Sequence, residues 1–548
     1  MTLKDQIKIF FKGDILDDDE ALKRYSTDAS VFSVKPQIVL FPKDSEDIQN
    51  IVKFALEKKK EGKHISVTAR GAGTCMSGGS LNDSIILDTT KYMSGVFVSQ
   101  NEKEAVVLPG TFYRDLEKAT LAKGLLMPAF TASKNICTVG GMVMNDSGGE
   151  KTLAYGKTGN YVKELKMVFS DGNEYTIKPL SKSELNEKTR KRNFEGLVYK
   201  KLAKLIEENS EKIKNAKPNV SKNSAGYFLW NVYREDGTFD LNKILVGSQG
   251  TLGIVTEITF SLVKEKKHSG LVVLFLKKLS DIPRVVNTVL PYKPESLESY
   301  DNHTIKTSLR FLPELVKQMK TKNTFSLIWS FVPEFFSMIL NGLPKLVVLA
   351  EFASDSFDDV ERRIKNLSRE LSNSGIKNKI AHNEEETEKY WAIRRGSFNL
   401  LRKINRGLRT APFIDDFIVR PEFLPEFLPK LESLLDKYKL KYTVAGHIGD
   451  GNFHIIPLMD IKNKESKKII VELSLKVYDL VLEYKGSITA EHNDGIMRTP
   501  FLEKMYGKEI VALFKETKEI FDPENIFNPG KKVGDTKKYL SEHIINEV

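Results

Sequence analysis

The sequence predicts an α+β fold with more than one domain, and three observations support this. Short apolar, β-branched runs alternate with segments whose apolar residues recur at helical spacing. The chain has 548 residues, which is more than one hydrophobic core usually holds. Two glycine clusters also lie in its first third, next to strand-like runs. We therefore expect at least two domains that combine helices with sheets.

The first half of the chain supplies most of these elements. Asp44 or Ser45 is a suitable N-cap for a helix whose apolar positions follow at helical spacing. A second helix is expected at 113–123, because Gly124 follows it directly. Residues 181–219 are rich in lysine and predict solvated helices. Alternating or continuous apolar runs predict strands at 37–41, 64–68, 85–87, 105–109, 165–169 and 174–177.

The second half begins after residues 264–267, a lysine-rich run that is typical of a domain boundary. Strands are expected at 271–275 and 347–351, and a charged helix at 358–374. Residues 326–340 are strongly apolar but are interrupted by proline and glutamate, so we expect a core helix there. A patch that contacts a membrane surface is the alternative.

The two glycine clusters, residues 70–79 and 138–149, together are typical of a flavin cradle. Glycine lets a ligand approach the backbone closely, and successive free N–H groups form a concave anion-binding site. The first cluster lies between two strand-like runs, so it is neither a Rossmann fingerprint, which opens a helix, nor a P-loop, which needs Gly-Lys-Ser/Thr. For a single cluster, a hairpin that binds nothing is an equally good interpretation.

Composition narrows the class of protein. Hydrophobic content of 41% and charged content of 29% are ordinary for soluble globular proteins. The net charge of +11 comes from lysines that are spread along the chain, which favours an anionic substrate, an acidic electron carrier or an anionic membrane surface. No compact basic stripe with interleaved aromatics occurs, so we expect no nucleic-acid partner.

Cys75 and Cys137 are the only cysteines, too few for a disulfide framework or for an iron–sulfur cluster without other ligands. The first residues lack an apolar segment of signal-peptide length, and no run of about 20 apolar residues occurs. We therefore expect a cytoplasmic protein, with contact at the inner face of the membrane as an alternative.

The sharpest motif of the second half is His447-Ile-Gly-Asp-Gly-Asn-Phe-His454. Its two histidines have glycines between them and can converge on one metal ion, and Glu491 supplies a carboxylate. Two imidazoles, a carboxylate and open positions suit catalytic zinc, with manganese or iron as alternatives. From the spacing alone, hydrogen-bonding core histidines are an alternative interpretation.

These motifs together resemble the FAD-linked oxidases. Residues 25–30, 70–79, 139–149, 155–158 and 246–257 resemble the FAD-binding domain of the vanillyl-alcohol oxidase type, or PCMH type, and residues 391–530 resemble the C-terminal domain of the family. The resemblance covers residues 20–533 and includes D-lactate dehydrogenase, the glycolate oxidase flavin subunit and D-2-hydroxyglutarate dehydrogenase.

The resemblance implies a two-subdomain FAD-binding domain and an α+β substrate domain, or cap, with an antiparallel sheet. It divides the chain into a lead segment (1–34), the FAD-binding domain (35–265), the cap (266–490) and a C-terminal segment that returns to the FAD domain (491–548). The FAD-binding residues that we expect are Arg70, Gly71, Ala72, Gly73, Thr74, Cys75, Ser77, Gly78, Gly79, Pro128, Thr138, Gly140, Gly141, Asn145, Gly148, Gly149, Gly156, Gly253 and Ile254.

The resemblance further implies oxidation of a small D-2-hydroxy acid, with D-lactate-like acids first and glycolate or D-2-hydroxyglutarate as alternatives. It strengthens the divalent metal site, zinc or manganese, at His447, His454 and Glu491. Arg394, in a Trp-x-x-Arg motif, is expected to bind the substrate carboxylate through a bidentate fork, unless it is an exposed arginine paired with Glu388. His492 is expected to take the hydroxyl proton.

Two departures from the family pattern stand out. Gln249 occupies a position where glutamate is usual, and Asn493-Asp494 extend the commoner Glu-His-Gly motif. The second variant resembles larger members that carry an iron–sulfur module, which is absent from this sequence. We therefore expect the electrons to reach a separate acceptor: a quinone, a cytochrome, an iron–sulfur protein or an electron-transfer flavoprotein.

Three rival interpretations remain. A sugar- or alditol-oxidising flavoenzyme that uses oxygen would not need the two histidines and Glu491. A non-catalytic flavin electron-transfer subunit would not need Arg394 or His492. A soluble binding module would bind no flavin. The sequence does not indicate an oligomeric state or a covalent flavin link.

Overall fold

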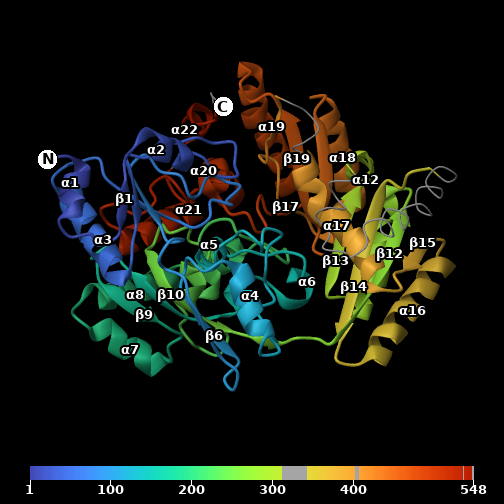
Figure 1. Cartoon of the computed structure of the whole chain (residues 1–548), viewed down its shortest axis with the longest axis horizontal. Helices are drawn as coiled ribbons and strands as arrows, with labels where there is room; N and C mark the ends of the chain where they lie inside the picture. The colour runs from blue at the N-terminus through green and yellow to red at the C-terminus, as the bar shows by residue number, and fades with distance from the viewer. Residues whose placement is uncertain (312–341, 402–406, 535, 546–548) are drawn as a thin grey trace.

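The computed structural model of the chain describes residues 1–311, 342–401, 407–534 and 536–545. Helices and mainly antiparallel sheets are mixed along it, which confirms the predicted α+β class. Two groups of elements lie side by side, and the C-terminal helices pack on both of them (Figure 1).

The N-terminal sheet has the strand order β1-β2-β4-β3. Both β2 and β3 run parallel to β4, whereas β1 is antiparallel to β2. Helix α3 packs on this sheet, with its N-terminus capped by Asp44 as the sequence predicts. The elements are α1 (Leu3–Lys8), β1 (Asp14–Leu16), α2 (Asp19–Tyr25), β2 (Ile38–Phe41), α3 (Ser45–Lys60), β3 (Val67–Arg70) and β4 (Ile85–Asp88).

A second, five-stranded antiparallel sheet has the order β5-β6-β10-β8-β9. Its strands are β5 (Val96–Ser99), β6 (Glu104–Val107), β8 (Val162–Val168), β9 (Glu174–Ile177) and β10 (Ile254–Ser261). The helices around it are α4 (Tyr113–Leu121), α5 (Val139–Asn145), α6 (Thr152–Tyr155), α7 (Lys182–Arg190), α8 (Phe194–Glu208), α9 (Ser210–Ala216) and α10 (Asn242–Leu245). Helix α21 (Leu502–Phe521) returns from the far end of the chain and buries Phe514 and Phe521 in the same core.

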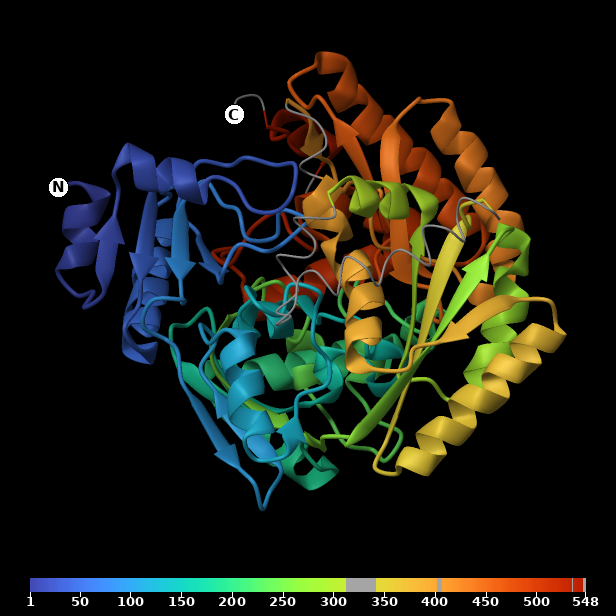
Figure 2. The same ribbon diagram turned by 45° about the vertical axis from the view of Figure 1, so that its right-hand side comes forward.

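The largest sheet is antiparallel, with the order β15-β12-β14-β13-β18-β19-β16 and β17 paired to β19 (Figure 2). Its strands are β12 (His268–Leu276), β13 (Ser296–Asp301), β14 (Leu346–Ser354), β15 (Lys377–Ile380), β16 (Arg409–Thr410), β17 (Phe417–Ile418), β18 (Lys441–His447) and β19 (Asn452–Met459). The antiparallel sheet expected for the second half is therefore present.

Both faces of this sheet are covered, because alternate side chains of β12 point to opposite sides. Val272 and Leu274 pack with α11 (Ile282–Val289), α16 (Phe357–Asn373), α18 (Leu424–Asp436) and α19 (Lys464–Glu483). Leu271 and Val273 pack with α12 (Asn302–Arg310) and α17 (Glu384–Leu401).

Some expectations need correction. The strand expected at 64–68 starts later, at Val67. The second glycine cluster, next to a strand-like run, instead forms helix α5. The apolar segment 326–340 lies outside the described residues. Within the part of the chain that the structure describes, no helix is long and apolar enough to cross a membrane.

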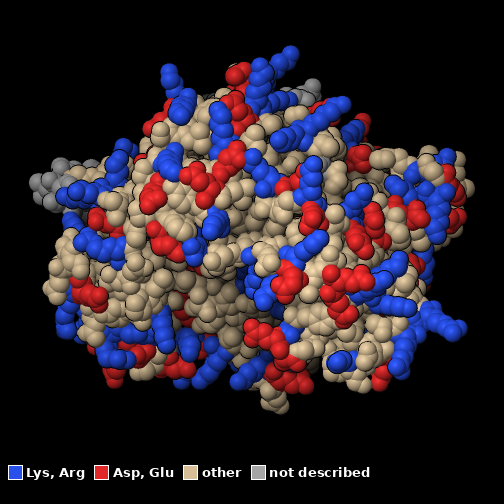
Figure 3. All heavy atoms as spheres, turned by 180° about the vertical axis from the view of Figure 1, so that it is seen from behind, with Lys and Arg blue, Asp and Glu red and all other residues tan. Residues whose placement is uncertain are grey.

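Lysines, arginines and acidic residues are interspersed over the face that Figure 3 shows, rather than gathered in one basic stripe. This agrees with the spread of the positive charge along the sequence.

Candidate active site

The β18–β19 hairpin brings the two predicted metal-binding histidines together. His454 lies opposite Ala445, two residues before His447, so both imidazoles lie on one face of the hairpin. Their ring centroids are 5.2 Å apart. Gly451 makes the tight turn possible: its φ is +75°, and a Cβ there would collide with the carbonyl oxygen of Val419.

Glu491 completes this cluster. Its Oε1 lies 3.0 Å from Nε2 of His447 and 3.4 Å from Nε2 of His454. The other ring nitrogen of each histidine meets a buried carboxylate: Nδ1 of His447 contacts Glu298, and Nδ1 of His454 lies 3.0 Å from Asp415. Carboxylates on the outer nitrogens, with the inner nitrogens converging, are the arrangement of metal-binding histidines.

The charges of the cluster shift its pKa values. Burial alone would raise the pKa of Glu491, but His447 and Lys222 outweigh it and hold this pKa well below its usual range. Burial would lower the pKa of His447, but Glu298 raises it to about 9. In the same way, Asp415 outweighs burial and raises the pKa of His454 to about 9.

Asp416 fixes the backbone that carries Glu491 and His492. Its Oδ2 accepts hydrogen bonds from the N–H groups of Ala490 at 3.0 Å, Glu491 at 2.9 Å and His492 at 2.7 Å. Asp416 itself is fully buried and has a left-handed φ of +74°. Such a strained conformation is stable only where the surroundings hold it.

Asp415 joins the predicted base to the predicted metal site. One of its oxygens lies 3.0 Å from Nδ1 of His454 and the other 2.7 Å from Nδ1 of His492. The rings of His454 and His492 are stacked, with centroids 5.0 Å apart. Burial would lower the pKa of His492, but Asp416 and Asp415 raise it.

The flavin half of the chain contributes Lys222, which the sequence reasoning missed. Its side chain is fully buried, and its Nζ lies 3.1 Å from Asp450 Oδ2 and 3.6 Å from Glu491 Oε2. No local pattern marks Lys222, because its partners lie more than 200 residues further along the chain. Glu298 was missed for a similar reason, since Arg394 and His447 lie 96 and 149 residues further along the chain.

Arg394 is not the exposed helix arginine that the alternative interpretation describes. It lies on α17, is buried, and directs Nε and Nη2 to Glu298 Oε2, at 3.1 and 2.9 Å. The neighbouring Arg395 is the residue that approaches Glu388, at 3.8 Å. Since Glu298 also contacts His447, it links Arg394 to the histidine cluster.

The donor set fits a divalent cation. Within the described residues, Asp416, His454, Glu491 and His492 place ligand atoms within 4.8 Å of one another. This group contains two of the three predicted ligands. His447 is outside it, but its Nε2 points at the same oxygen of Glu491 as His454 does. Asp416 is already occupied by backbone N–H groups, so His447 is the better third ligand.

The first glycine cluster is a strand-to-strand loop between β3 and β4, as predicted. Among the described residues, no hydrogen bond from the backbone N–H groups of 71–76 is found. Gly71 packs directly on Thr138, so the two clusters touch. Ala72 is exposed, and Gly71 and residues 73–76 are partly exposed. Such a row of free N–H groups fits a pyrophosphate.

The second glycine cluster differs from the first because some of its backbone N–H groups are already hydrogen-bonded. The N–H groups of Val139 and Gly140 already bond to Thr111 and Pro109, because α5 starts there. Gly141, however, is exposed, and a Cβ on it would meet only the Thr138 hydroxyl, at 3.3 Å. Gly148 borders the histidine cluster: a Cβ there would lie 2.5 Å from Glu491 Oε2. The predicted flavin loops therefore adjoin the predicted metal site.

The remaining predicted flavin residues lie around these loops. The Arg70 guanidinium bonds to the carbonyls of Tyr25 and Thr27, and Asn145 donates to the carbonyl of Glu491. The Cys75 thiol accepts from the N–H of Gly79, and burial raises its pKa, which favours the thiol form. Buried within the protein are Ser77, Gly78, Pro128, Gly149, Gly253 and Ile254, whereas Gly156 has a left-handed φ of +73°.

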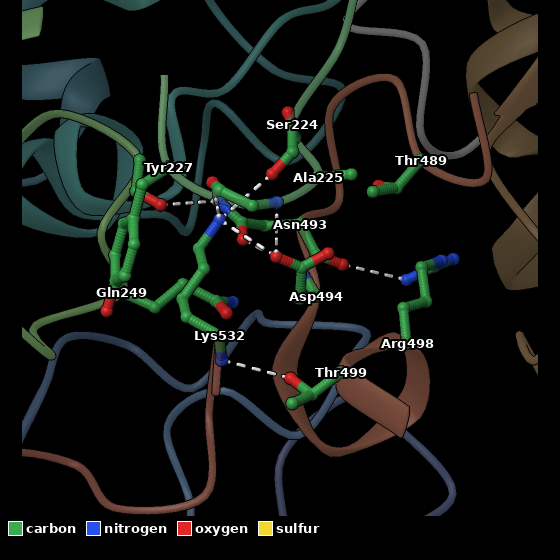
Figure 4. A network of polar contacts seen from close by, with 12 residues as sticks. Ser224, Ala225, Tyr227, Gln249, Thr489, Asn493, Asp494, Arg498, Thr499 and Lys532 are labelled. Atoms are coloured by element: carbon green, nitrogen blue, oxygen red, sulfur yellow. Dashed lines mark hydrogen bonds and ion pairs between the residues drawn. The ribbon is translucent and has the colours of Figure 1, made fainter. Parts of the chain in front are cut away.

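Figure 4 shows how the two family departures fit together. Asp494 forms an ion pair with Lys532, at 3.0 Å, and Lys532 also donates to the carbonyls of Ser224 and Gly226. Gln249 donates to Asn145 Oδ1 at 3.2 Å and accepts from the N–H of Gly495 at 2.8 Å. The amide thus ties the second flavin loop to the segment that follows Glu491 and His492.

Comparison with known families assigns both halves of the chain. Residues 36–178 match the FAD binding domain, and residues 265–532 match the C-terminal domain of FAD linked oxidases. The chain therefore belongs to the FAD-linked oxidases, which confirms the resemblance seen in the sequence motifs.

Several curated proteins are similar to almost the whole chain. The D-2-hydroxyglutarate dehydrogenase of Pseudomonas putida is 28% identical over 95% of this chain, although the chain spans only about half (50%) of that protein. The glycolate oxidase subunit GlcD of Bacillus subtilis is 26% identical, over 92% of this chain and 91% of its own. The D-lactate dehydrogenase of Archaeoglobus fulgidus is 26% identical, over 90% and 91% of the two chains.

Solved structures share the fold. The 4-ethylphenol oxidase of Gulosibacter chungangensis aligns with a TM-score of 0.67 over 96% of this chain and 95% of its own, at 16% identity. An alkyldihydroxyacetonephosphate synthase aligns with a TM-score of 0.65 over 96% of this chain and 84% of its own, also at 16% identity.

Proposed function

We propose that this protein oxidises a small D-2-hydroxy acid to the 2-oxo acid with bound FAD and passes the electrons to a separate acceptor. The observation that carries the proposal is the contact between the two predicted sites, since Gly148 of the flavin loops leaves room for the carboxylate of Glu491. A flavin in the glycine cradle would thus lie beside a histidine and carboxylate cluster. FAD, when bound, supplies the hydride acceptor.

We propose that His447, His454 and Glu491 hold a divalent cation, zinc or manganese. A cation there would polarise the substrate hydroxyl and lower the pKa of the neighbouring His492. The support is the convergence of two Nε2 atoms on one carboxylate oxygen, with buried carboxylates on both Nδ1 atoms.

His492 takes the hydroxyl proton in this proposal. Asp415 orients the ring through Nδ1, so the Nε2 atom is the proton acceptor. Arg394 supplies the positive charge for the substrate carboxylate, and Glu298 fixes the plane of its guanidinium. The cap sheet carries His447 and His454, and His447 is buried.

Anaerobic reduction of the bound flavin tests the proposal. D-lactate, glycolate, D-2-hydroxyglutarate and their L-enantiomers, where these exist, are added to the purified protein together with simple alditols. We expect bleaching of the flavin absorbance by a D-2-hydroxy acid, fastest with D-lactate-like molecules. Faster bleaching by L-acids or alditols would contradict the substrate class, and a colourless protein that binds no FAD would contradict the whole proposal.

A sugar- or alditol-oxidising flavoenzyme is the weaker candidate, because such chemistry does not need two histidines that converge on one glutamate. The similarity to proteins named D-2-hydroxyglutarate dehydrogenase keeps that acid as the main alternative substrate.

A further inference from the structure

Lys222 is a buried charge beside the histidine cluster that the proposed mechanism does not use. It lies in the segment between α9 and the short 3-10 helix at Leu229–Asn231, and its side chain is fully buried. A buried lysine is ordinarily stabilised by an ion pair and by hydrogen bonds from its ammonium group. Among the described residues, Nζ of Lys222 makes ion-pair contacts but no hydrogen bond of good geometry.

Its two ion-pair partners belong to the two segments that carry the proposed metal ligands. Asp450 lies in the turn of the β18–β19 hairpin, three residues after His447, and its Oδ2 is 3.1 Å from Lys222 Nζ. Glu491 lies in the loop that Asp416 fixes, with Oε2 at 3.6 Å. The ammonium group of Lys222 thus connects the β18–β19 hairpin to Glu491.

The two oxygens of Glu491 have different surroundings. Oε1 faces Nε2 of His447 and Nε2 of His454, at 3.0 and 3.4 Å. Oε2 faces Lys222 and Gly148, and no hydrogen bond to it is found in the described part of the chain. The carboxylate therefore presents one oxygen to the histidines and turns the other toward a positive charge.

We infer that Lys222 is a positioning residue that makes Glu491 a one-oxygen ligand and weakens cation binding at the site. This inference rests on the proposed metal site. A carboxylate that binds through one oxygen leaves a coordination position open for a substrate, as catalytic metal sites require. The fixed positive charge of Lys222 repels a divalent cation nearby and opposes binding.

The inference predicts that substitution of Lys222 strengthens metal binding rather than weakening it. Removal of a supporting residue around a metal ligand ordinarily weakens metal binding by about 10–100-fold. Lys222→Met should instead tighten it, by about tenfold or more, because Glu491 and Asp450 lose their counter-charge and Glu491 can turn both oxygens to the cation. Turnover should fall at the same time, because the open position is lost. Lys222→Arg keeps the charge and should restore affinity toward the wild-type value.

The experiment is a chelator competition that measures zinc and manganese affinity of the FAD-loaded protein, with X-ray absorption to count the oxygens on zinc. Lys222→Gln repeats the neutral change with a polar side chain, in case Lys222→Met fails to hold FAD. Lys518→Met is the matched control, since Lys518 is also buried and ion-paired, to Asp522, but contacts no residue of the site. It should leave metal affinity unchanged.

Unchanged or weaker cation binding in both neutral variants would overturn the inference and leave Lys222 with a structural role. The proposed metal site is tested separately by His454→Ala. If wild-type protein and His454→Ala bind cations equally, the metal site itself is wrong, whatever Lys222 does.

Discussion

Asp415 divides its two oxygens between two histidines that have different proposed roles. His454 belongs to the proposed metal site and His492 is the proposed base, and both turn Nδ1 toward this one carboxylate. The two rings also stack on each other. Their orientations are therefore coupled, so a change at Asp415 should affect metal binding and proton transfer together.

Asp415→Asn tests this coupling. The amide offers one acceptor oxygen where the carboxylate offers two, so one histidine must lose its Nδ1 partner. We expect cation affinity and the rate of flavin reduction to fall by about 10–100-fold each. Chelator competition and anaerobic stopped flow measure the two quantities. Normal values for both would show that the histidines are oriented by other contacts.

The roles of His492 and His454 are separable by substitution. His492→Ala should lower kcat by about 10²–10⁴-fold, as expected for the loss of a general base, while cation and FAD content stay normal. His454→Ala should lose the cation as well. Elemental analysis and flavin absorbance accompany the kinetics. If His492→Ala reduces its flavin at a normal rate, the base lies elsewhere.

At the scale of elements, the two glycine clusters show which secondary structure the sequence can predict and which it cannot. The loop between β3 and β4 was predictable, since strand-like runs lie on both sides of it. Helix α5 was not, because its Gly140-Gly141 pair has very low helix propensity. The helix forms because the Thr138 side chain caps it and Pro109 and Thr111 accept its first N–H groups. These contacts arise only in the folded chain.

The candidate site likewise contains residues that the sequence could predict and residues that only the structure reveals. The spacing of His447 and His454 allowed them to converge, and in the structure they do so because a glycine-rich turn joins two strands there. Glu298 lies 149 residues before His447 and Lys222 lies 225 residues before it, so only the folded chain reveals them. The structure gives the adjacent Asp415 and Asp416 separate contacts: Asp415 lies against the two histidines, and Asp416 accepts from the loop that carries Glu491 and His492.

A pair of glycines on α5 separates ligand binding from folding. A valine at Gly141 would find space in the protein, whereas one at Gly140 would collide with Pro109, 2.7 Å from its Cβ. We expect Gly141→Val to fold normally but to lose FAD, because its side chain would occupy the proposed cradle. Gly140→Val should lower Tm as well. Flavin absorbance and thermal unfolding measure the two effects, and full FAD occupancy in Gly141→Val would remove α5 from the cradle.

At the scale of the whole molecule, ion pairs to buried carboxylates connect the flavin half to the cap sheet. Arg395 of α17 donates twice to Glu150, at 2.8 Å each. Lys151 and Tyr155 both reach Glu295, just before β13, at 2.8 and 2.6 Å. Because Glu150 and Glu295 already place two carboxylates beside Lys151, a further negative charge at this interface should lower the stability of the folded protein.

Glu351 supplies that charge. It lies on β14 opposite Ser296, and burial, with Glu295 and Glu150 nearby, outweighs Lys151 and Arg395 and raises its pKa to about 7. Since the folded pKa exceeds the ordinary value of 4.5, the protonated form favours the folded state. Its stabilising contribution is complete below pH 4.5 and is lost as the pH rises through about 7.

Glu351→Gln should therefore be more stable than the wild type at pH 8 and nearly equal to it at pH 4.5. The side chain is only partly buried, so we expect a difference on the order of 1–2 kcal/mol. Because a chain with several cores need not unfold in one step, the measurement is the difference in Tm between the two proteins across this pH range. Glu361→Gln, on the partly exposed pair with Lys365, is the control and should show no such trend. A Tm difference that does not grow between pH 4.5 and 8 would mean that Glu351 is already ionised at the interface, with Lys151 and Arg395 compensating its charge.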